Sequence, residues 1–530
     1  MSDTTVDVIV DDNLNKLHIN VQAGEMLIDV LRKSGKYIRS ECGGKGTCGK
    51  CLVEIPGVGQ VLSCQYKIKS SISVLISTRQ KARILESAEM PLKEVINDSG
   101  IKKDKDNEYL KFTFNGREIH LKETGDNSSV TEYGIAVDVG TTTVVIYLEN
   151  LADYKIVDAI SFINPQVSFG SDVISRINHT IENKNGLKML QKRLLDAINT
   201  SLDQMCSSNC IKSEHIFKAE FAGNTIMLHL LLGVNPASIA SAPYKPEFVE
   251  ERNLSADMLG LRINPKGFVK ILPSLSGYVG ADIIAGIAAT NLADTEKYSL
   301  FIDIGTNGEI ALGNKHVVFC CAAAAGPAFE GARIQCGTGG VEGAISHYYN
   351  GRYETIGNKK PVGICGSGVI DIIAYLLETG KINTNGQMKE NFILEYSGKT
   401  AVNGNIFLTP RDVSEIQLAK AAIYAGIKIL IKEAGVVLSQ IENVFLAGGF
   451  GNFMDPQSAV KIGLIPFELR EKIFSVGNSA GAGARLSLRS VHFNTEIHEL
   501  LNKAKYVELS MRTDFNDEYV DAMVFPVFNN

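Results

Sequence analysis

Long apolar runs and clusters of basic residues are both missing from this sequence. The alanine-rich stretch Val317 to Phe329 falls short of the roughly 18 residues that a membrane-spanning helix needs. The first thirty residues contain no basic segment followed by an apolar core, so we predict no secretion signal. The net charge is −6, and no arginine-rich arm or basic helix favours nucleic acid. These absences predict a cytoplasmic protein that binds neither a membrane nor nucleic acid.

Two common nucleotide signatures are not supported either. Gly398-Lys399-Thr400 is similar to the end of a P-loop, but Ile393 stands where the first glycine of that loop belongs. Residues 44–49 match the dinucleotide pattern G-x-G-x-x-G, yet no strand-to-helix junction and no later ribose-binding acid frame them. We therefore discard both motifs and look elsewhere for a phosphate site.

Cysteine, by contrast, is concentrated near the start of the chain. Four thiolates, three of them in a glycine-rich loop, can hold zinc or an iron–sulfur cluster. Zinc sites usually present two C-x2-C pairs and this segment has one, which favours the cluster and leaves zinc as the alternative. The spacing is C-x5-C-x2-C-x12-C, formed by Cys42, Cys48, Cys51 and Cys64.

Residues 1–78 are predicted to form one compact module around this loop. Short strands are expected at Val6 to Val10 and Leu17 to Val21, followed by a helix at Leu27 to Arg32. The order of these elements and the cysteine loop resemble ferredoxin-type [2Fe–2S] domains of the α+β β-grasp fold. The resemblance implies that the four cysteines ligate the cluster, although x5 departs from the plant-type x4 spacing.

Residues 79–131 change in composition and read as a linker. Charged and polar residues dominate, with room for one small hairpin around Leu110 to Leu121. A tether of this kind suits a redox module that must move between an electron donor and an acceptor.

An Asp-Gly-Thr turn between two apolar strands occurs twice in the rest of the chain. The first copy is Asp138 to Thr143, and the second is Asp303 to Glu309. Each turn combines a carboxylate, hydroxyls and exposed backbone amides, which together suit a phosphate chain and its Mg²⁺. One copy would be an ordinary turn signal, but two copies indicate a shared function.

The two copies lie in a duplicated frame. Ile216 to Thr225 aligns with Ile441 to Phe450, since each is a strand that ends in Ala-Gly after a helix-like segment. Strands and helices alternate throughout, so we predict two α/β halves, residues 132–292 and 293–530, with a nucleotide between them. The glycines of Leu446 to Asn452 would let the backbone approach an adenosine closely.

The paired turns and the Gly-Gly segment resemble the actin-like ATPase superfamily, which has a ribonuclease-H-like fold and includes sugar kinases. The resemblance implies that Asp138 and Asp303 orient Mg²⁺, usually through water. It implies that the turns hold the ATP phosphates and that Gly448 and Gly449 flank the adenosine. The residues assigned to the nucleotide are Gly140, Thr141, Thr142, Gly305, Thr306, Asn307, Gly448, Gly449 and Phe450.

The residue that positions a catalytic water is less defined by the sequence. Gln166 and Glu309 are the preferred candidates, and Asp172 and Glu330 are further ones. Asp172 and Glu330 are both expected in the first turn of a helix, where an acid also stabilises the helix dipole for purely structural reasons.

An iron–sulfur module joined to an actin-like ATPase is a narrow combination. The whole chain resembles the reductive activators of corrinoid enzymes, which reduce Co(II) corrinoid to Co(I) so that methyl transfer resumes. That resemblance implies a corrinoid protein partner, a low-potential electron donor and a homodimer. An ATP-driven electron donor to another low-potential enzyme is one alternative. A small-molecule kinase with a structural zinc module is the other.

Overall fold

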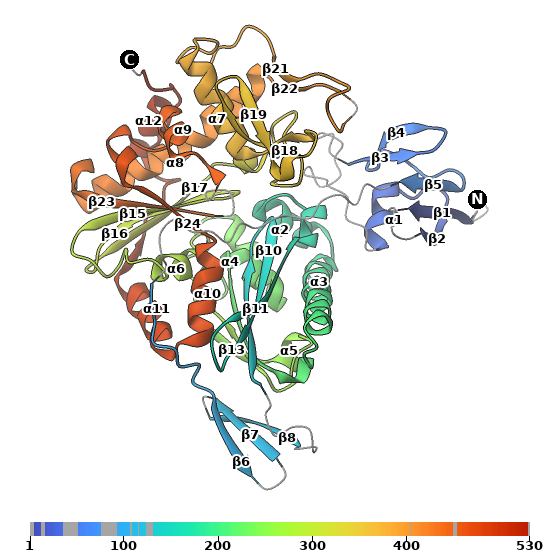
Figure 1. Ribbon diagram of the computed structural model, residues 1–530, viewed down its shortest axis with the longest axis vertical. Helices are drawn as coiled ribbons and strands as arrows, with labels where there is room; N and C mark the ends of the chain where they lie inside the picture. Colours follow the sequence, from blue (N-terminus) through green and yellow to red (C-terminus); the bar gives the residue numbers. More distant parts are fainter. Residues whose placement is uncertain are drawn as a thin grey trace.

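The computed structural model of the 530-residue chain is shown in Figure 1. It describes residues 5–11, 16–34, 51–75, 93–106, 109–114, 116–122, 131–402, 404–448 and 453–527. The predicted site residues Cys42, Cys48, Gly449 and Phe450 lie outside the described residues. No helix within the described ranges is long and apolar enough to cross a bilayer.

In its described residues, the N-terminal module has a five-stranded sheet in the order β2-β1-β5-β3-β4 and one helix. β1 pairs antiparallel with β2 and parallel with β5. Val8, Val10, Leu27, Leu31 and Val74 form its core. The β-grasp arrangement, its first two strands and its helix are confirmed. The elements are β1 (Thr5–Asp11), β2 (Lys16–Gln22), α1 (Leu27–Lys33), β3 (Leu52–Ile55), β4 (Gly59–Leu62) and β5 (Ile72–Leu75).

A small antiparallel sheet of three strands follows this module in the sequence and lies at the bottom of the view in Figure 1, below the large α/β region. It consists of β6 (Lys102–Asp106), β7 (Tyr109–Phe114) and β8 (Arg117–Lys122). β7 and β8 form the predicted hairpin, whereas β6 was not predicted because its sequence, Lys-Lys-Asp-Lys-Asp, has no apolar alternation. Phe112 stacks on Phe217 with ring centroids 4.2 Å apart, so this sheet is packed against the region that follows.

The first half of the α/β region is a six-stranded sheet covered by helices. Its strands follow the order β11-β10-β9-β12-β14-β13. The strands are β9 (Tyr133–Val139), β10 (Thr143–Asn150), β11 (Ile156–Ile163), β12 (Ile216–Gly223), β13 (Arg252–Ser255) and β14 (Phe268–Ile271). The helices are α2 (Val173–Glu182), α3 (Gly186–Ser208), α4 (Thr225–Leu232), α5 (Ala256–Leu259) and α6 (Ala281–Ala288).

The second half contains another six-stranded sheet, in the order β24-β23-β15-β16-β17-β25. Its strands are β15 (Tyr298–Ile304), β16 (Gly308–Gly313), β17 (Val318–Ala323), β23 (Ile441–Ala447), β24 (Ile473–Gly477) and β25 (Ala504–Tyr506). Its helices are α7 (Gly366–Glu378), α8 (Pro410–Ala434), α9 (Pro456–Lys461) and α12 (Thr513–Asp521). Smaller sheets are made by β18 (Ala344–Tyr349), β19 (Arg352–Thr355), β20 (Gly363–Ile364), β21 (Phe392–Glu395) and β22 (Ile406–Leu408).

The two large sheets repeat one topology. In the first, β11-β10-β9 pair antiparallel, and β9, β12 and β14 pair parallel. In the second, β17-β16-β15 and then β15, β23 and β24 follow the same order and directions. This correspondence confirms the duplicated α/β fold, and it aligns β12 with β23 as the Ala-Gly segments predict.

Two helices near the C-terminus return to the first half. They are α10 (Ser479–Arg489) and α11 (Val491–Lys503). Leu486, Leu488 and Phe493 are buried in the same apolar core as β9 and β12. In Figure 1, α10 and α11 lie beside α6, where the two halves meet. The division of the sequence at residue 292 stays a prediction, because segments from both sides of it share this core.

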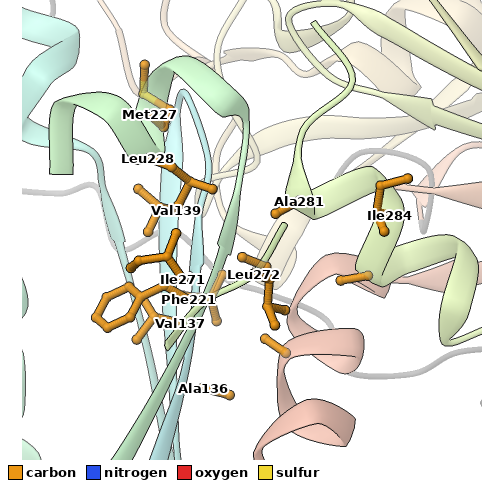
Figure 2. Close-up of a cluster of buried hydrophobic side chains, with 14 of the residues drawn as sticks. Ala136, Val137, Val139, Phe221, Met227, Leu228, Ile271, Leu272, Ala281 and Ile284 are labelled. Carbon is orange, nitrogen blue, oxygen red and sulfur yellow. The ribbon is translucent and has the colours of Figure 1, made fainter. Parts of the chain in front are cut away.

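The core under the first Asp-Gly-Thr turn is made of buried apolar side chains. Val137, Phe221 and Ile271 are neighbours on three adjacent strands and are fully buried. Figure 2 shows these three side chains on one side of the strands, whereas Leu272 lies on the other side, toward Ala281 of α6. Because such a core resists deformation, the turn at its edge is held in a fixed position.

Candidate functional site

The two Asp-Gly-Thr turns lie at corresponding edges of the two sheets. In the first, Val139 pairs with Val144, and residues 140–143 form the connection. In the second, Ile304 pairs with Gly308, and residues 305–307 form the connection. A Cβ on Gly140 would lie 2.4 Å from the Thr143 carbonyl oxygen, so only glycine fits the first turn.

Glu330 joins the two turns directly. It lies at the end of the short 3₁₀ helix Pro327–Glu330. Its carboxylate accepts hydrogen bonds from the Thr142 hydroxyl, at 3.1 Å from Oγ1 to each carboxylate oxygen. It also accepts one from the Thr306 hydroxyl, at 2.9 Å. Hydroxyls from both halves therefore converge on one acidic group, which brings the predicted phosphate residues Thr142 and Thr306 together.

Five carboxyl groups surround this meeting point. Burial raises the pKa of Asp303 to about 8, and the neighbouring charges of Asp282, Asp138 and Glu330 add to the shift. Burial, followed by the charge of Asp282, raises the pKa of Asp138 to about 7. Glu309, buried beside Asp282 and Asp303, has its pKa raised well above the usual value. Like charges held this close favour binding of a cation, which would stabilise their ionised forms.

Two members of the site were not predicted from the sequence. Asp282 is in the first turn of α6, where burial raises its pKa to about 6. Asn478 caps α10, and its side chain hydrogen-bonds to Asp138. Each was detectable as a lone polar residue beside an apolar or small-residue helix, Gly-Ala-Asp-Ile-Ile in one case and Asn-Ser-Ala-Gly-Ala in the other. Neither signal is specific without the fold.

The remaining turn residues lie beside these groups. The Gly305 amide donates to the Asn307 carbonyl at 2.9 Å, which closes the second turn. The Asn307 side chain donates to Glu309 at 3.2 Å. In the first turn, the Thr141 carbonyl accepts a hydrogen bond from the buried Arg176. Gly140, Thr141, Gly305 and Asn307 thus line the same junction as Asp138 and Asp303.

The described part of the adenosine segment reaches the second turn. Gly448 has a φ of +97°, and a Cβ there would lie 2.7 Å from Oδ1 of Asp303. Only glycine avoids both the strained backbone and this collision. The segment that was assigned to adenosine therefore touches the carboxylate that was assigned to Mg²⁺.

Two candidates for positioning a water have structural roles instead. Gln166 is fully buried, donates to the Leu190 carbonyl at 3.0 Å and accepts from Arg176 at 3.3 Å. Asp172 caps α2 by accepting from the Ser175 amide at 2.8 Å. Glu309 and Glu330, in contrast, lie within the carboxyl cluster.

No group of three or more His, Cys, Asp or Glu side chains within the described ranges is arranged to ligate one metal ion directly. The carboxyl groups of Asp138, Asp282 and Asp303 still fit a hydrated divalent cation, because Mg²⁺ keeps several of its waters and is commonly held through one or two carboxylates and phosphates. The geometry therefore suits a cation that is held partly through water.

The described part of the cysteine loop brings two thiols together. Cys51 and Cys64 are both buried, and their sulfur atoms are 3.1 Å apart. This distance is far longer than the roughly 2.05 Å of a disulfide. Two adjacent buried sulfurs fit shared ligation of one metal ion, which suits an iron–sulfur cluster. The other two predicted ligands, Cys42 and Cys48, belong to the undescribed part of this loop.

Three family descriptions match consecutive parts of the chain. Residues 10–69 match the 2Fe-2S iron-sulfur cluster binding domain. Residues 133–295 match the RACo middle region, and residues 297–530 match the C-terminal domain of RACo, described as the ASKHA domain. The predicted fold class, with a β-grasp iron–sulfur domain followed by a duplicated actin-like region, is confirmed.

Two characterised relatives cover most of the chain. The corrinoid activation enzyme RamQ of Eubacterium limosum is 31% identical over 580 aligned residues, covering 96% of this chain and 97% of the relative. The [Co(II) methylated amine-specific corrinoid protein] reductase of Methanosarcina barkeri is 26% identical, covering 73% of this chain and 76% of the relative.

A solved structure agrees over the whole length. The reductive activator for corrinoid, iron-sulfur protein superposes with a TM-score of 0.75 at 32% identity, covering 98% of each chain. Together with the three consecutive domain matches, this agreement shows that the chain belongs to the family of reductive activators of corrinoid proteins.

Proposed function

We propose that this protein is an ATP-dependent reductive activator that delivers one electron to the Co(II) corrinoid of a partner protein and so produces Co(I) for methyl transfer. The observation that carries the proposal is the meeting of the two Asp-Gly-Thr turns, where threonine hydroxyls and five carboxyl groups lie together. The same chain holds the adjacent thiols of Cys51 and Cys64. The names of the relatives support the corrinoid partner.

The cysteines of the first domain have the task of holding the redox centre. Cys42, Cys48, Cys51 and Cys64 supply four thiolates, and burial of Cys51 and Cys64 keeps water away from two of them. When bound, a [2Fe–2S] cluster of this type takes up and releases one electron at a potential near −400 mV. The described residues therefore provide a protected position for one-electron chemistry.

The residues where the two Asp-Gly-Thr turns meet would bind the nucleotide. The Thr142 and Thr306 hydroxyls and the amides of the two turns would hold phosphate oxygens from both sides. Asp138 and Asp303 would orient Mg²⁺ through its waters, and Gly448 would leave room for the adenosine. Asp282, Glu309 and Glu330 are the acidic groups of the site that would position the attacking water, since Gln166 and Asp172 are engaged elsewhere.

Coupling to ATP is required if the electron transfer runs uphill. An acceptor about 200 mV below the donor would make a one-electron transfer unfavourable by roughly 4.6 kcal/mol, at ~59 mV per tenfold change in the equilibrium constant. A nucleotide-driven change in the complex can offset a gap of that size. We further propose a low-potential electron donor, a homodimer and a cytoplasmic location.

The decisive experiment is anaerobic. The protein, a Co(II) corrinoid protein and a low-potential reductant are mixed, and the Co(I) absorbance band is followed with and without Mg-ATP. We expect Co(I) only when Mg-ATP is present. If no Co(I) forms with several corrinoid proteins despite an intact [2Fe–2S] spectrum, the acceptor is a different low-potential enzyme and the proposal fails.

One pair of cysteine variants separates the redox role from protein stability. Cys64→Ser should abolish the [2Fe–2S] spectrum and Co(I) formation while ATP binding continues. Cys210→Ser removes an exposed thiol from another part of the chain and is the matched control. Electron transfer that survives Cys64→Ser would contradict the ligand assignment.

A further inference from the structure

The tether is hydrogen-bonded to the large α/β region through residues 93–101, in addition to the packing of β7 against Phe217. We call residues 93–101 the tether joint. The Lys93 amide donates to the Ala289 carbonyl at 3.0 Å, just beyond the end of α6. The Asp98 amide donates to the Arg489 carbonyl at 2.8 Å, and the Asp98 carbonyl accepts from the Val491 amide at 2.9 Å. The backbone of the tether is thus bonded to the C-terminal ends of α6 and α10.

Two lysines reinforce this joint. Nζ of Lys93 lies 2.8 Å from Asp294 and 2.7 Å from Glu496 on α11. Nζ of the buried Lys218 donates to the Leu488 carbonyl at 3.0 Å and to the Ser99 carbonyl at 3.4 Å. Lys218 therefore links the last turn of α10 to the tether.

A buried acid balances the Lys218 ammonium. Oε1 of Glu220 is 3.1 Å from Nζ of Lys218, and both side chains are almost fully buried. The Ser487 hydroxyl donates to the other Glu220 oxygen at 3.0 Å. Removing one partner of such a buried pair leaves an uncompensated charge and costs several kcal/mol, so the link is strong only as a whole.

The opposite ends of the same two helices lie in the nucleotide site. α6 begins beside Asp282, and α10 is capped by Asn478, which hydrogen-bonds to Asp138. At about 1.5 Å per residue, helices of this length span roughly 12–16 Å. Figure 1 shows α6 and α10 side by side between the two sheets, with the tether passing along α11.

The two helices touch through their backbones. A Cβ on Gly483 of α10 would lie 2.2 Å from the Ala285 carbonyl oxygen of α6. A Cβ on Gly286 of α6 would lie 2.7 Å from the Ser479 hydroxyl oxygen of α10. Because both contacts involve a glycine and leave no space for a larger side chain, a shift of one helix has to displace the other.

The tether joint combines apolar packing with an open space. Val95 and Ile101 pack against the core of the first half, and Ser99 is buried. A cavity of about 170 Å³ borders the Lys93 end of the joint and is lined by residues that include Lys93, Thr290, Asp294, His492 and Lys503. The joint is therefore packed against the same core as α10, with open space on one side.

We propose that the α6–α10 pair transmits the nucleotide state to the tether joint and thereby positions the tethered iron–sulfur domain for electron transfer. Lys93 and Lys218 are positioning residues in this device, because they act through the tether and not on the nucleotide. The proposal rests on nucleotide binding at the site proposed above. Coupling between two sites is reciprocal, so a change at the joint must alter nucleotide affinity by the same factor as nucleotide alters the joint.

Hydrogen exchange on the full-length protein tests the first direction. Exchange of peptides covering residues 93–101 and 487–494 is compared with and without Mg²⁺ and a non-hydrolysable ATP analogue. We expect a change of about fivefold or more in the exchange rate of these peptides. Peptides from β21 and β22, in the second half, serve as the internal reference. Unchanged exchange at the joint, with analogue binding demonstrated by calorimetry, would overturn the inference alone, whereas absence of binding would overturn the proposed function.

Variants test the reverse direction. Lys93→Met and the double variant Lys218→Met/Glu220→Gln should each change the dissociation constant of the analogue by about fivefold, and Lys93→Arg should restore it. The matched control is Lys103→Met on β6, which removes a more exposed ion pair between Lys103 and Glu132. We expect its dissociation constant for the analogue to be unchanged. The double variant avoids leaving a buried charge unpaired. If it does not fold, Lys93→Met decides. A lower melting temperature with an unchanged constant would assign both lysines a purely structural role.

Discussion

The two halves of the ATPase region carry the same turn in different electrostatic surroundings. In the first half, Asp138 pairs across the strands with Val145 and hydrogen-bonds to Asn478. In the second half, Asp303 occupies the matching place but pairs with Glu309. The duplicated position opposite the aspartate is therefore apolar in one half and acidic in the other.

Because of this difference, the two aspartates differ in pKa and in how strongly their turns should bind a cation. Burial and three carboxyl neighbours raise the pKa of Asp303 to about 8, whereas the Asn478 hydrogen bond opposes the rise at Asp138, whose pKa is about 7. Carboxyl groups are thus concentrated on the second turn, where ionising them without a cation is more costly. A divalent cation would relieve more repulsion there than on the first turn.

The largest expected effect comes from removing either aspartate. Asp138→Ala and Asp303→Ala should each lower Mg-ATP hydrolysis by about a hundredfold or more, the rate equivalent of roughly 3 kcal/mol of lost stabilisation of transition-state charge. Asp303→Ala should also need about tenfold more Mg²⁺ for half-saturation than Asp138→Ala, because the second turn has more carboxyl groups that a cation would stabilise in their ionised forms. Steady-state rates across a Mg²⁺ series measure both effects.

The [2Fe–2S] spectrum is the control for this pair, and it should be unchanged in both variants. Equal Mg²⁺ requirements would remove the asymmetry between the turns. Loss of the cluster would argue against separate redox and nucleotide modules.

The matching glycines give the next effect. Gly448→Ala introduces strain at a φ of +97° and pushes a Cβ against Asp303, a cost of about 1–3 kcal/mol. We expect at least a tenfold loss of nucleotide affinity by calorimetry. Gly223→Ala, at the corresponding strand end of the first half, meets the Val139 carbonyl oxygen at 2.8 Å and should lower the melting temperature more than the affinity. The opposite ranking of the two affinities would show that the first half dominates binding.

Exchanging the residues opposite the aspartates has a moderate effect. Glu309→Val copies the first half into the second and relieves a buried carboxyl cluster. We expect the melting temperature without Mg²⁺ to rise by about 2–4 °C, equivalent to roughly 1 kcal/mol for a domain of this size. Val145→Glu makes the reverse exchange and should lower it by a similar amount. A fall in both variants would mean that packing at this position outweighs charge.

The last prediction concerns the difference between the buried lysines of the two halves. Lys218 is paired with Glu220, but Lys420 donates to the Val524 carbonyl at 2.7 Å, and burial lowers its pKa to about 7. The unfolded chain therefore holds more protons than the folded protein between pH 7 and about 10.5, and stability should rise with pH in that window. Lys420→Met should flatten this rise in urea unfolding curves, while Lys103→Met should not. A slope that survives Lys420→Met would assign the rise to other groups.

Much of this fold was predictable because its signals are local. The apolar runs around Asp138 and Asp303 predicted the paired strands, and the Ala-Gly segments predicted β12 and β23 as equivalents. Periodicity and turn chemistry are properties of consecutive residues, so they survive without knowledge of the tertiary structure. The roles assigned to individual turn residues stay predictions.

The features that were missed depend on contacts between distant segments. Asp282 joins the site only because α6 begins at the meeting point of two sheets, and Asn478 joins it because α10 returns to the first half. Gln166 and Asp172 have suitable side chains, but Gln166 donates a hydrogen bond to the Leu190 carbonyl and Asp172 accepts one from the Ser175 amide. A sequence pattern shows which groups are available, whereas packing decides which of them face each other.

Glu330 has a consequence for how the protein responds to its nucleotide. Its carboxylate accepts hydrogen bonds from both the Thr142 and the Thr306 hydroxyls. Glu330 therefore acts as an intramolecular ligand of these two hydroxyls. A polyphosphate that uses the same hydroxyls competes with an intramolecular rival whose effective concentration cannot be diluted. Its apparent affinity is the intrinsic affinity reduced by the fraction of molecules that have released Glu330. The ATP concentration needed to displace Glu330 is therefore set by the protein itself, and substituting Glu330 would change it.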